Sequence, residues 1–286
     1  MIDKIRKIAE ENRIGAIGIV KARVFDELSN TLNSRTPMVS ENLERRINPF
    51  LIMERAKSII VCLFPYYKNG EKTNLSLYAK GVDYHKITRE KLGKIKDFLE
   101  QNGYQAEIKV DDETLPERHL AYLAGLGFLG KNGSLINDKF GSFVFIGYIV
   151  TDLELEANTP SNKTCLNCGK CITHCPGGAI SENSINPYLC ASYITQKKGE
   201  LTDSEKKIIK KSGYVWGCDI CQAVCPHNGN LPEYGIPEFS ENLTDKLTDD
   251  MAASNREFKK KYQEKAFSWR GYDIIKRNLE IFKEET

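Results

Sequence analysis

The sequence lacks a long hydrophobic run. The longest apolar stretch, SIIVCLF at residues 58–64, is far shorter than the roughly 20 apolar residues that a membrane-spanning helix needs. The opening MIDKIRKIAEEN is an amphipathic pattern without an apolar core or a cleavage site, so we expect no signal peptide. The net charge of only +2 gives no general attraction for polyanions, so nucleic-acid contacts must come from local patches. These absences predict a cytoplasmic protein with no membrane partner.

The nine cysteines do not fit a disulfide scaffold, which is typical of short secreted chains. In a reducing compartment, clustered cysteines more often bind metal. One cluster has the spacing C-x₂-C-x₂-C-x₃-C-P and comprises Cys165, Cys168, Cys171 and Cys175. In bacterial ferredoxins with this spacing, three cysteines hold one 4Fe–4S cluster and the fourth, before proline, ligates the other. A second set of ligands must therefore exist.

The second set consists of Cys190 and of three cysteines that end before Pro226, namely Cys218, Cys221 and Cys225. Crossed pairing assigns one cluster to Cys165, Cys168, Cys171 and Cys225, and the other to Cys175, Cys190, Cys218 and Cys221. Zinc is the alternative, although zinc needs neither a third closely spaced cysteine nor the Cys-Pro ends. The ninth cysteine, Cys62, lies within an apolar run and is expected to act as a small hydrophobe.

Strand-like and helix-like segments alternate along the first 155 residues. Strands are expected at 13–22, 55–67, 105–112 and 142–150, and helices at 1–13, at 85–102 and after Pro116. The stretch EANTPSNK at 156–163 has the composition of a linker. We therefore expect an α+β protein with an α/β domain at 1–155, a ferredoxin-like domain with two 4Fe–4S clusters at 156–232, and a charged, mostly helical segment at 233–286.

Several stretches resemble the epoxyqueuosine reductase family. They are YAKGVDYHK (78–86), VDDETLPERHLAYLAGLGFLGKN (110–132), FGSFVFIGYIVTD (140–152) and CASYITQKKG (190–199), together with the paired cysteine sets. The resemblance implies a cobalamin-dependent iron–sulfur enzyme that completes queuosine synthesis in tRNA and is related to reductive dehalogenases. It places cobalamin and substrate in domain 1–155. Longer family members carry a C-terminal helical-repeat extension, which we do not expect in this chain.

The reaction that the resemblance implies removes an epoxide oxygen with two electrons and two protons, giving an alkene and water. A carboxylic acid kept protonated near the corrin would protonate the leaving oxygen. The family register, fixed by Glu117 and Arg118, assigns this catalytic role to Asp111. The family often has Asp-Thr/Ser-Gly/Ala where this chain has Asp111-Asp112-Glu113. From the residues alone, Asp111 or Asp112 would more simply cap the following helix.

The resemblance also implies a set of contacts with cobalamin and substrate. Its members are Arg46, Ser76, Asp83, Tyr84, His85, Asp111, Lys131, Asn132, Leu135 and Ile146. Some have simpler explanations, because Asp83–His85 could form a helix cap with an aromatic staple and Arg46 could be a surface base. The glycine-rich GLGFLGK lacks the Walker spacing, so we do not expect nucleotide binding there.

Basic runs occur at several places, and most are typical of solvated helix faces. QKKG differs because it follows Cys190 closely, so Lys197 and Lys198 are expected to contact tRNA phosphates near the mouth of the site. The sequence thus predicts an epoxyqueuosine reductase that acts on the tRNA anticodon stem-loop, with electrons from an external donor such as a flavodoxin or ferredoxin. The alternatives are a cobalamin and iron–sulfur reductase of a small substrate and a two-cluster electron-transfer protein. Corrin binding and a response to tRNA distinguish the three.

Overall fold

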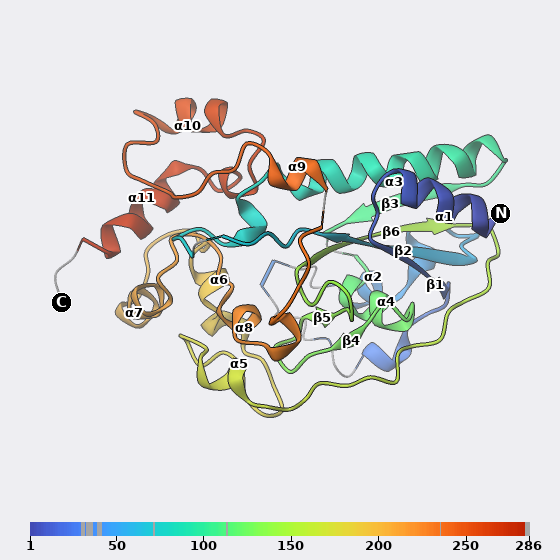
Figure 1. Ribbon diagram of the computed structural model, residues 1–286, viewed down its shortest axis with the longest axis horizontal. Helices are drawn as coiled ribbons and strands as arrows, with labels where there is room; N and C mark the ends of the chain where they lie inside the picture. Colours follow the sequence, from blue (N-terminus) through green and yellow to red (C-terminus); the bar gives the residue numbers. More distant parts are fainter. Residues whose placement is uncertain are drawn as a thin grey trace. The chain divides into compact units, whose positions relative to one another are not determined.

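The computed structural model describes residues 1–29, 32, 37–38, 42–70, 72–112, 114–234 and 236–283 (Figure 1). The chain forms two compact units. The first comprises Met1–Pro65 and His85–Leu166, and the second comprises Tyr66–Tyr84 and Asn167–Thr286. The expected mixture of helices and sheet is confirmed.

The first unit is built on a four-stranded sheet in the order β1-β2-β6-β3. Its strands are β1 (Ala16–Lys21), β2 (Ser58–Pro65), β3 (Ala106–Val110) and β6 (Val144–Thr151). Every neighbouring pair is antiparallel, so the unit is α+β rather than α/β. The central strand β2 is buried throughout, as its apolar run predicts, and Cys62 within it is fully buried. A two-stranded hairpin, β4 (Phe128–Leu129) and β5 (Leu135–Ile136), lies outside the main sheet.

Helices cover both faces of this sheet (Figure 1). One face carries α1 (Ile2–Glu11) and α3 (Tyr84–Gln101), and the other carries α2 (Leu43–Ile47) and α4 (Glu117–Leu123). The helix expected at 85–102 is confirmed as α3, whose buried residues recur at three- and four-residue spacing. α4 approaches the sheet closely at Gly18, where an added Cβ would lie 2.2 Å from the Ala124 carbonyl oxygen. Across the described ranges, no helix is both long and apolar enough to cross a membrane.

The second unit is mainly helical. Its helices are α5 (Lys170–Thr173), α6 (Ala191–Ile194), α7 (Asp203–Ser212), α8 (Ile220–Ala223), α9 (Pro237–Ser240), α10 (Asn255–Lys261) and α11 (Tyr272–Ile281). Its core unites Trp216, which lies between two cysteines, with Phe258, Phe267 and Tyr272 from the C-terminal segment. The C-terminal segment thus shares a core with the cysteine region.

Residues 66–84 belong to the second unit, whereas the sequence suggested that they belong to the first. Leu75 forms a β-bridge with Trp216. The Asn74 side chain donates to the Leu247 carbonyl at 2.8 Å and accepts from the Leu247 amide at 2.9 Å. These contacts join positions more than a hundred residues apart, which local sequence patterns do not report.

Candidate active site

Asp111 directly follows β3 and adopts a left-handed backbone conformation, with φ of 42°. Such a conformation is uncommon outside glycine and often marks a functional position. The Asp111 amide donates to Glu117 Oε1 at 2.5 Å. Its carboxylate Oδ2 lies 3.5 Å from His85 Nε2, and the Asp111 and His85 side chains are 58% and 38% exposed. Two predicted site residues therefore meet at the end of β3, accessible to a ligand.

Glu117, in the first turn of α4, is the acid to which the Asp111 backbone is anchored. Desolvation raises the pKa of Glu117 well above its ordinary value, and the neighbouring Asp111 charge raises it further. Two interacting carboxyls hold a proton more readily than either does alone. In the sequence analysis Glu117 served only to align Asp111 with the family pattern, because an acid in the first turn of a helix is common.

Asp112 has a separate set of contacts. Its Oδ1 accepts from the Thr114 hydroxyl at 2.5 Å, and its Oδ2 lies 3.4 Å from Lys109 Nζ. The Thr114 hydroxyl is also 2.7 Å from the hydroxyl of Tyr148, a buried residue of β6. The N-cap of α4 is Pro116, with no side-chain cap hydrogen bond, so the interpretation of Asp111 or Asp112 as a helix cap is wrong.

The other predicted cofactor residues of the first unit lie in three settings. Arg46 is only 6% exposed and burial lowers the pKa of its guanidinium, so it is not an ordinary surface base. Leu135 and Ile146 are core residues, 2% and 9% exposed. Lys131 and Asn132 lie in the turn between β4 and β5, where Asn132 Oδ1 accepts from a backbone amide at 3.1 Å. Their roles toward a cofactor are proposals.

Ser76, in the second unit, supports the second cysteine segment. It is fully buried, and its hydroxyl donates to Asp219 Oδ1. The other oxygen of Asp219 accepts from the Leu77 amide at 2.7 Å. Because Asp219 directly follows Cys218, this buried carboxylate ties the 76–77 turn to a predicted cluster ligand.

Asp83 and Tyr84 are also held within the second unit. The Asp83 amide donates to the Glu264 carbonyl at 2.7 Å. The Tyr84 ring packs edge-on against Tyr78, with 6.3 Å between ring centroids. These contacts explain part of the YAKGVDYHK stretch structurally and leave its cofactor role as a proposal.

Four cysteines of one predicted crossed set are electrostatic neighbours. The pKa values of Cys218 and Cys221 are raised to about 12, mainly by burial and in part by neighbouring thiols that include Cys190 and Cys175. Cys175 Sγ also accepts from the Ala179 amide at 3.2 Å, the type of N–H···S contact that tunes iron–sulfur clusters. Among the described residues, no three His, Cys, Asp or Glu side chains are arranged to hold a single metal ion.

The two cysteine segments have the same local backbone. The cysteine four residues before the Cys-Pro cysteine, Cys171 in the first segment and Cys221 in the second, lies in a four-residue helix, α5 and α8 respectively. Each helix is followed by a cysteine before proline, Cys175 or Cys225, whose amide donates to a carbonyl three residues earlier at 3.2 Å and 3.1 Å. The spacing therefore specifies the same turn twice, as expected for a duplicated cluster-binding motif.

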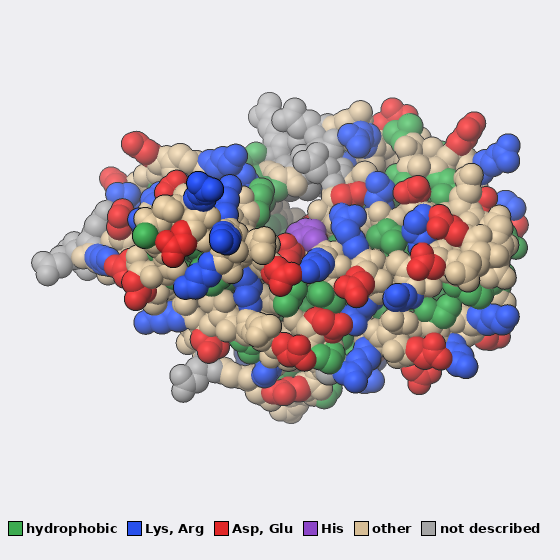
Figure 2. All heavy atoms as spheres, turned by 90° about the horizontal axis from the view of Figure 1, so that it is seen from above, with side chains coloured by type: hydrophobic (Ala, Val, Ile, Leu, Met, Phe, Trp, Pro, Cys, Tyr) green, Lys and Arg blue, Asp and Glu red, His purple; other side chains and the backbone are tan. Residues whose placement is uncertain are grey.

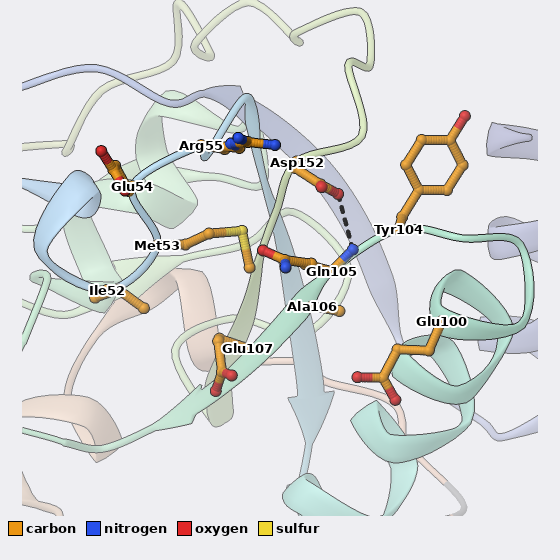
Figure 3. Close-up of a pocket in the computed structure, with 10 residues that line it drawn as sticks. All are labelled: Ile52, Met53, Glu54, Arg55, Glu100, Tyr104, Gln105, Ala106, Glu107 and Asp152. Carbon is orange, nitrogen blue, oxygen red and sulfur yellow. Dashed lines mark hydrogen bonds between the residues drawn. The ribbon is translucent and has the colours of Figure 1, made fainter.

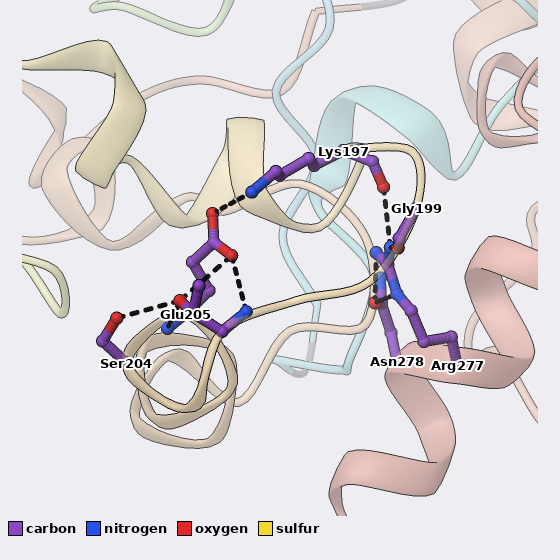
Figure 4. A network of polar contacts seen from close by, with 7 residues as sticks. Lys197, Gly199, Ser204, Glu205, Arg277 and Asn278 are labelled. Atoms are coloured by element: carbon purple, nitrogen blue, oxygen red, sulfur yellow. Dashed lines mark hydrogen bonds and ion pairs between the residues drawn. The ribbon is translucent and has the colours of Figure 1, made fainter.

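Lys197 and Lys198 differ in their surroundings. Lys197 Nζ lies 2.6 Å from Glu205 Oε1 on α7, and its side chain is 32% exposed (Figure 4). Lys198 is exposed. Lys198 is thus the better placed of the two for an external phosphate.

Two α11 residues that the sequence analysis missed shape the same loop. Arg277 Nη1 donates to the Lys197 and Gly199 carbonyls at 2.7 Å and 2.6 Å (Figure 4). Asn278, which is fully buried, donates to the Thr195 carbonyl at 2.7 Å. In the sequence they are one basic and one amide residue on an amphipathic helix, and local patterns cannot predict that such residues bind a distant loop.

Comparison with known proteins gives matches along most of this chain. Residues 46–111 match the family model described as epoxyqueuosine reductase QueG, DUF1730, and residues 164–228 match the 4Fe–4S double cluster binding domain. An epoxyqueuosine reductase from Lactococcus garvieae is 34% identical over 97% of this chain and 84% of its own length. The chain belongs to the epoxyqueuosine reductase family. It is therefore an oxidoreductase.

Solved structures of this family share the fold. An epoxyqueuosine reductase with a tRNA-Tyr epoxyqueuosine-modified stem loop is 30% identical, with a TM-score of 0.88 over 98% of this chain and 80% of that one. A Bacillus subtilis epoxyqueuosine reductase with its catalytic aspartate loop swung out of the active site is 29% identical, covers the same shares and has a TM-score of 0.87. A catabolic reductive dehalogenase, 15% identical over 98% of this chain and 36% of its own, shares the fold at a TM-score of 0.51.

A cavity of about 550 Å³ in the first unit lies away from the residues expected to act in this epoxyqueuosine reductase family member. It is lined by residues 52–55, by Glu100, by 104–107 and by Asp152 (Figure 3). Within it, Asp152 Oδ1 accepts from the Gln105 amide at 2.8 Å. Gln105 precedes β3 and Asp111 follows it, so the cavity and Asp111 are at opposite ends of this strand, roughly 20 Å apart.

The raised pKa of Glu117 predicts a pH-dependent stability. Unfolded glutamate titrates near 4.5, whereas the folded carboxyl keeps its proton to higher pH. The folded state therefore binds more protons in this window, and the stability that Glu117 contributes falls as pH rises above 4.5. Glu117→Gln preserves the acceptor oxygen and removes the titration. From about pH 5 to about pH 8, the melting temperature of the wild type should fall relative to that of the variant.

The matched control is Glu90→Gln, which changes an exposed glutamate on α3. Its melting curve should track the wild type at every pH. A constant gap between wild type and Glu117→Gln across this range would contradict the raised pKa.

Proposed function

We propose that the chain catalyses the reaction for which its family is named, the two-electron reductive removal of the epoxide oxygen of epoxyqueuosine in tRNA to give queuosine. The observation that carries this proposal is the family match at 46–111, which ends on Asp111. The proximity of Asp111 and His85 supports it. The same chain matches the 4Fe–4S double cluster binding domain, and two such clusters would carry electrons to the site.

We assign two 4Fe–4S clusters to the eight cysteines by crossed pairing. The neighbouring thiols of Cys175, Cys190, Cys218 and Cys221 support one set. The other four, Cys165, Cys168, Cys171 and Cys225, are assigned to the second cluster, and the similar backbone turns around Cys171 and Cys221 are in keeping with two clusters of the same type. These residues form the ferredoxin-like part of the chain, with residues 164–228 as its matched extent. We further propose a flavodoxin or ferredoxin as the external donor, acting in the cytoplasm.

We assign cobalamin to the unit that holds the four-stranded sheet. Cobalamin, when bound, supplies a strongly reducing cobalt centre for cleaving a carbon–oxygen bond. The exposed carboxylate and imidazole of Asp111 and His85 are suited to face it and the substrate. The other residues assigned to its binding are Arg46, Lys131, Asn132, Leu135 and Ile146 in this unit, with Ser76, Asp83 and Tyr84 in the second.

The proton chemistry falls to Asp111. The epoxide oxygen must be protonated as its carbon–oxygen bond breaks, because an alkoxide is a poor leaving group. Asp111 donates this proton from a position fixed by the hydrogen bond of its amide to Glu117. His85, 3.5 Å from the Asp111 carboxylate, orients it and stabilises its ionised form after transfer. Two electrons and two protons then account for the alkene and the water.

For tRNA we propose phosphate contacts at Lys198 first and Lys197 second. Lys and Arg side chains are interspersed with Asp and Glu on the face drawn in Figure 2, in keeping with the net charge of +2. Binding of a polyanion such as tRNA therefore depends on a few positioned cations rather than on a positive electrostatic field over the whole surface. Arg277 and Asn278 fix the backbone that presents these two lysines.

Neutralising Lys198 should reduce the salt dependence of stem-loop binding. Each lost phosphate contact flattens the slope of log affinity against log salt by roughly 0.7–0.9. Lys197→Ala should change the slope less, since Lys197 already pairs with Glu205. The measurement is titration of an anticodon stem-loop at several salt concentrations. Lys7→Ala, which removes a 75% exposed lysine from α1, is the control and should leave the slope unchanged. Equal slopes for Lys198→Ala and wild type would remove Lys198 from the contact.

A further inference from the structure

The second unit carries an exposed tryptophan stacked with an arginine. Trp269 is 53% exposed, although it follows the buried turn Ala266–Ser268. The guanidinium carbon of Arg270 lies 3.6 Å from the centroid of the Trp269 ring. A guanidinium at this distance stacks on one face of an indole. Because Trp269 is still 53% exposed, part of its surface is accessible to a second planar group.

Trp269 is held in place by a polar contact. Its Nε1 donates to Gln196 Oε1 at 3.4 Å. Gln196 is fixed in turn, because its Nε2 donates to the Ser192 carbonyl at 2.9 Å. A fixed side chain loses less conformational freedom when a ligand stacks on it. Gln196 directly precedes Lys197 and Lys198, so the exposed ring adjoins the loop that presents these lysines.

In the part of the chain that the structure describes, the Arg270 guanidinium beside this ring has a nitrogen without a hydrogen-bond partner. Among the described residues, its Nε is shielded from solvent and has no hydrogen-bond acceptor. Desolvation lowers the pKa of this guanidinium, and Tyr193 acts on it electrostatically. The ring of Tyr193 meets that of Tyr188, 47% exposed, edge-on with centroids 5.6 Å apart. The surface therefore combines aromatic faces with a cationic side chain.

We propose that Trp269 and Arg270 form a stacking surface for an unpaired nucleobase of the tRNA anticodon loop. This inference rests on the proposed function and adds a positioning contact to it. Aromatic side chains next to cations are the means by which proteins bind unpaired nucleotides, because every base has a π face and every linkage a phosphate. A base stacks on Trp269 while its phosphate or an acceptor edge meets Arg270. A duplex offers no free base face for this contact.

The test compares wild type, Trp269→Ala and Trp269→Phe, each reconstituted with iron, sulfide and cobalamin, in binding a fluorescently labelled anticodon stem-loop. Loss of one base stack should weaken binding by Trp269→Ala roughly 5- to 150-fold. Trp269→Phe retains an aromatic face and should keep most of the affinity. The salt dependence should be the same in all three, because the substitutions remove no charge. Phe282→Ala, which removes another exposed aromatic of this unit, is the matched control and should bind as wild type does.

A second readout uses intrinsic fluorescence, since the chain has two tryptophans and Trp216 is fully buried. Stem-loop binding should quench the Trp269 emission, and a fully paired duplex of equal length should not. Wild-type affinity in Trp269→Ala would overturn the stacking surface and leave the proposed function intact. Equal loss in Trp269→Phe and Trp269→Ala, or equal binding of the duplex, would also overturn it. Failure of the wild type to bind any stem-loop would overturn the surface together with the tRNA substrate.

Discussion

Replacing Asp111 with asparagine is expected to lower turnover by roughly 10²- to 10⁴-fold, the usual contribution of a general acid. Asparagine keeps the shape of the side chain and removes the transferable proton. The Asp111 amide should still donate to Glu117, so the strained backbone at φ 42° should persist. Cobalamin content and cluster spectra should therefore match the wild type, and the loss should appear in the single-turnover rate.

The control is Asp112→Asn, at the adjacent carboxylate. Asp112 is engaged by Thr114 and Lys109, so its replacement should cost stability more than rate. Near-normal turnover by Asp111→Asn, combined with loss in Asp112→Asn, would place the acid one residue later. Normal turnover in both variants would remove this loop from the proton chemistry.

Replacing Cys175 and Cys171 with alanine should abolish turnover in both variants through different clusters. Crossed pairing places Cys175 with Cys190, Cys218 and Cys221, which are its electrostatic neighbours. Cys171 belongs to the other set, although it lies four residues away in the sequence. Because electrons must cross both clusters, loss of either one interrupts the path.

The measurement is iron content with electron paramagnetic resonance of the reduced protein. The wild type should hold about eight irons, and each variant should lose or alter the signal of one cluster while keeping the other. Cys62→Ala, at a buried cysteine of β2, is the control and should keep both signals. If both ligand variants lose the same signal, the crossed pairing is wrong. Stoichiometric zinc in the wild type would contradict iron–sulfur ligation altogether.

Features with local causes could be predicted from the sequence. The periodicity of 85–102 identified α3, and the apolar run at 55–67 identified the buried strand β2. Both patterns depend on residues close together in the chain. The cysteine spacing likewise specified two turns of the same backbone. The sequence also pointed to Asp111 and His85, which the structure brings within 3.5 Å.

Features that depend on contacts between distant parts of the chain could not be predicted from the sequence. The raised pKa of Glu117 depends on desolvation and on the neighbouring Asp111 charge, which a single acid at a helix start does not reveal. The cap interpretation failed because Pro116 occupies the N-cap of α4. The pairing of Lys197 with Glu205 requires α7 to fold back onto the loop after α6.

The division of the chain also depends on distant contacts. Residues 66–84 join the second unit through Asn74, Leu75 and Ser76, whose partners lie more than a hundred residues later. The hairpin of β4 and β5 has two-residue strands, too short for any periodicity to detect.

We expect cobalamin and the iron–sulfur clusters of this chain to act together in reducing epoxyqueuosine in tRNA. The most direct test is a single-turnover reaction of the reduced, reconstituted protein with an epoxyqueuosine-containing anticodon stem-loop, followed by mass spectrometry of the digested nucleosides. Epoxyqueuosine should lose one oxygen atom in proportion to the cobalamin-loaded protein, and omitting cobalamin should abolish the conversion. Unchanged epoxyqueuosine with both cofactors bound, or equal conversion without cobalamin, would contradict a cobalamin-dependent reduction by this chain.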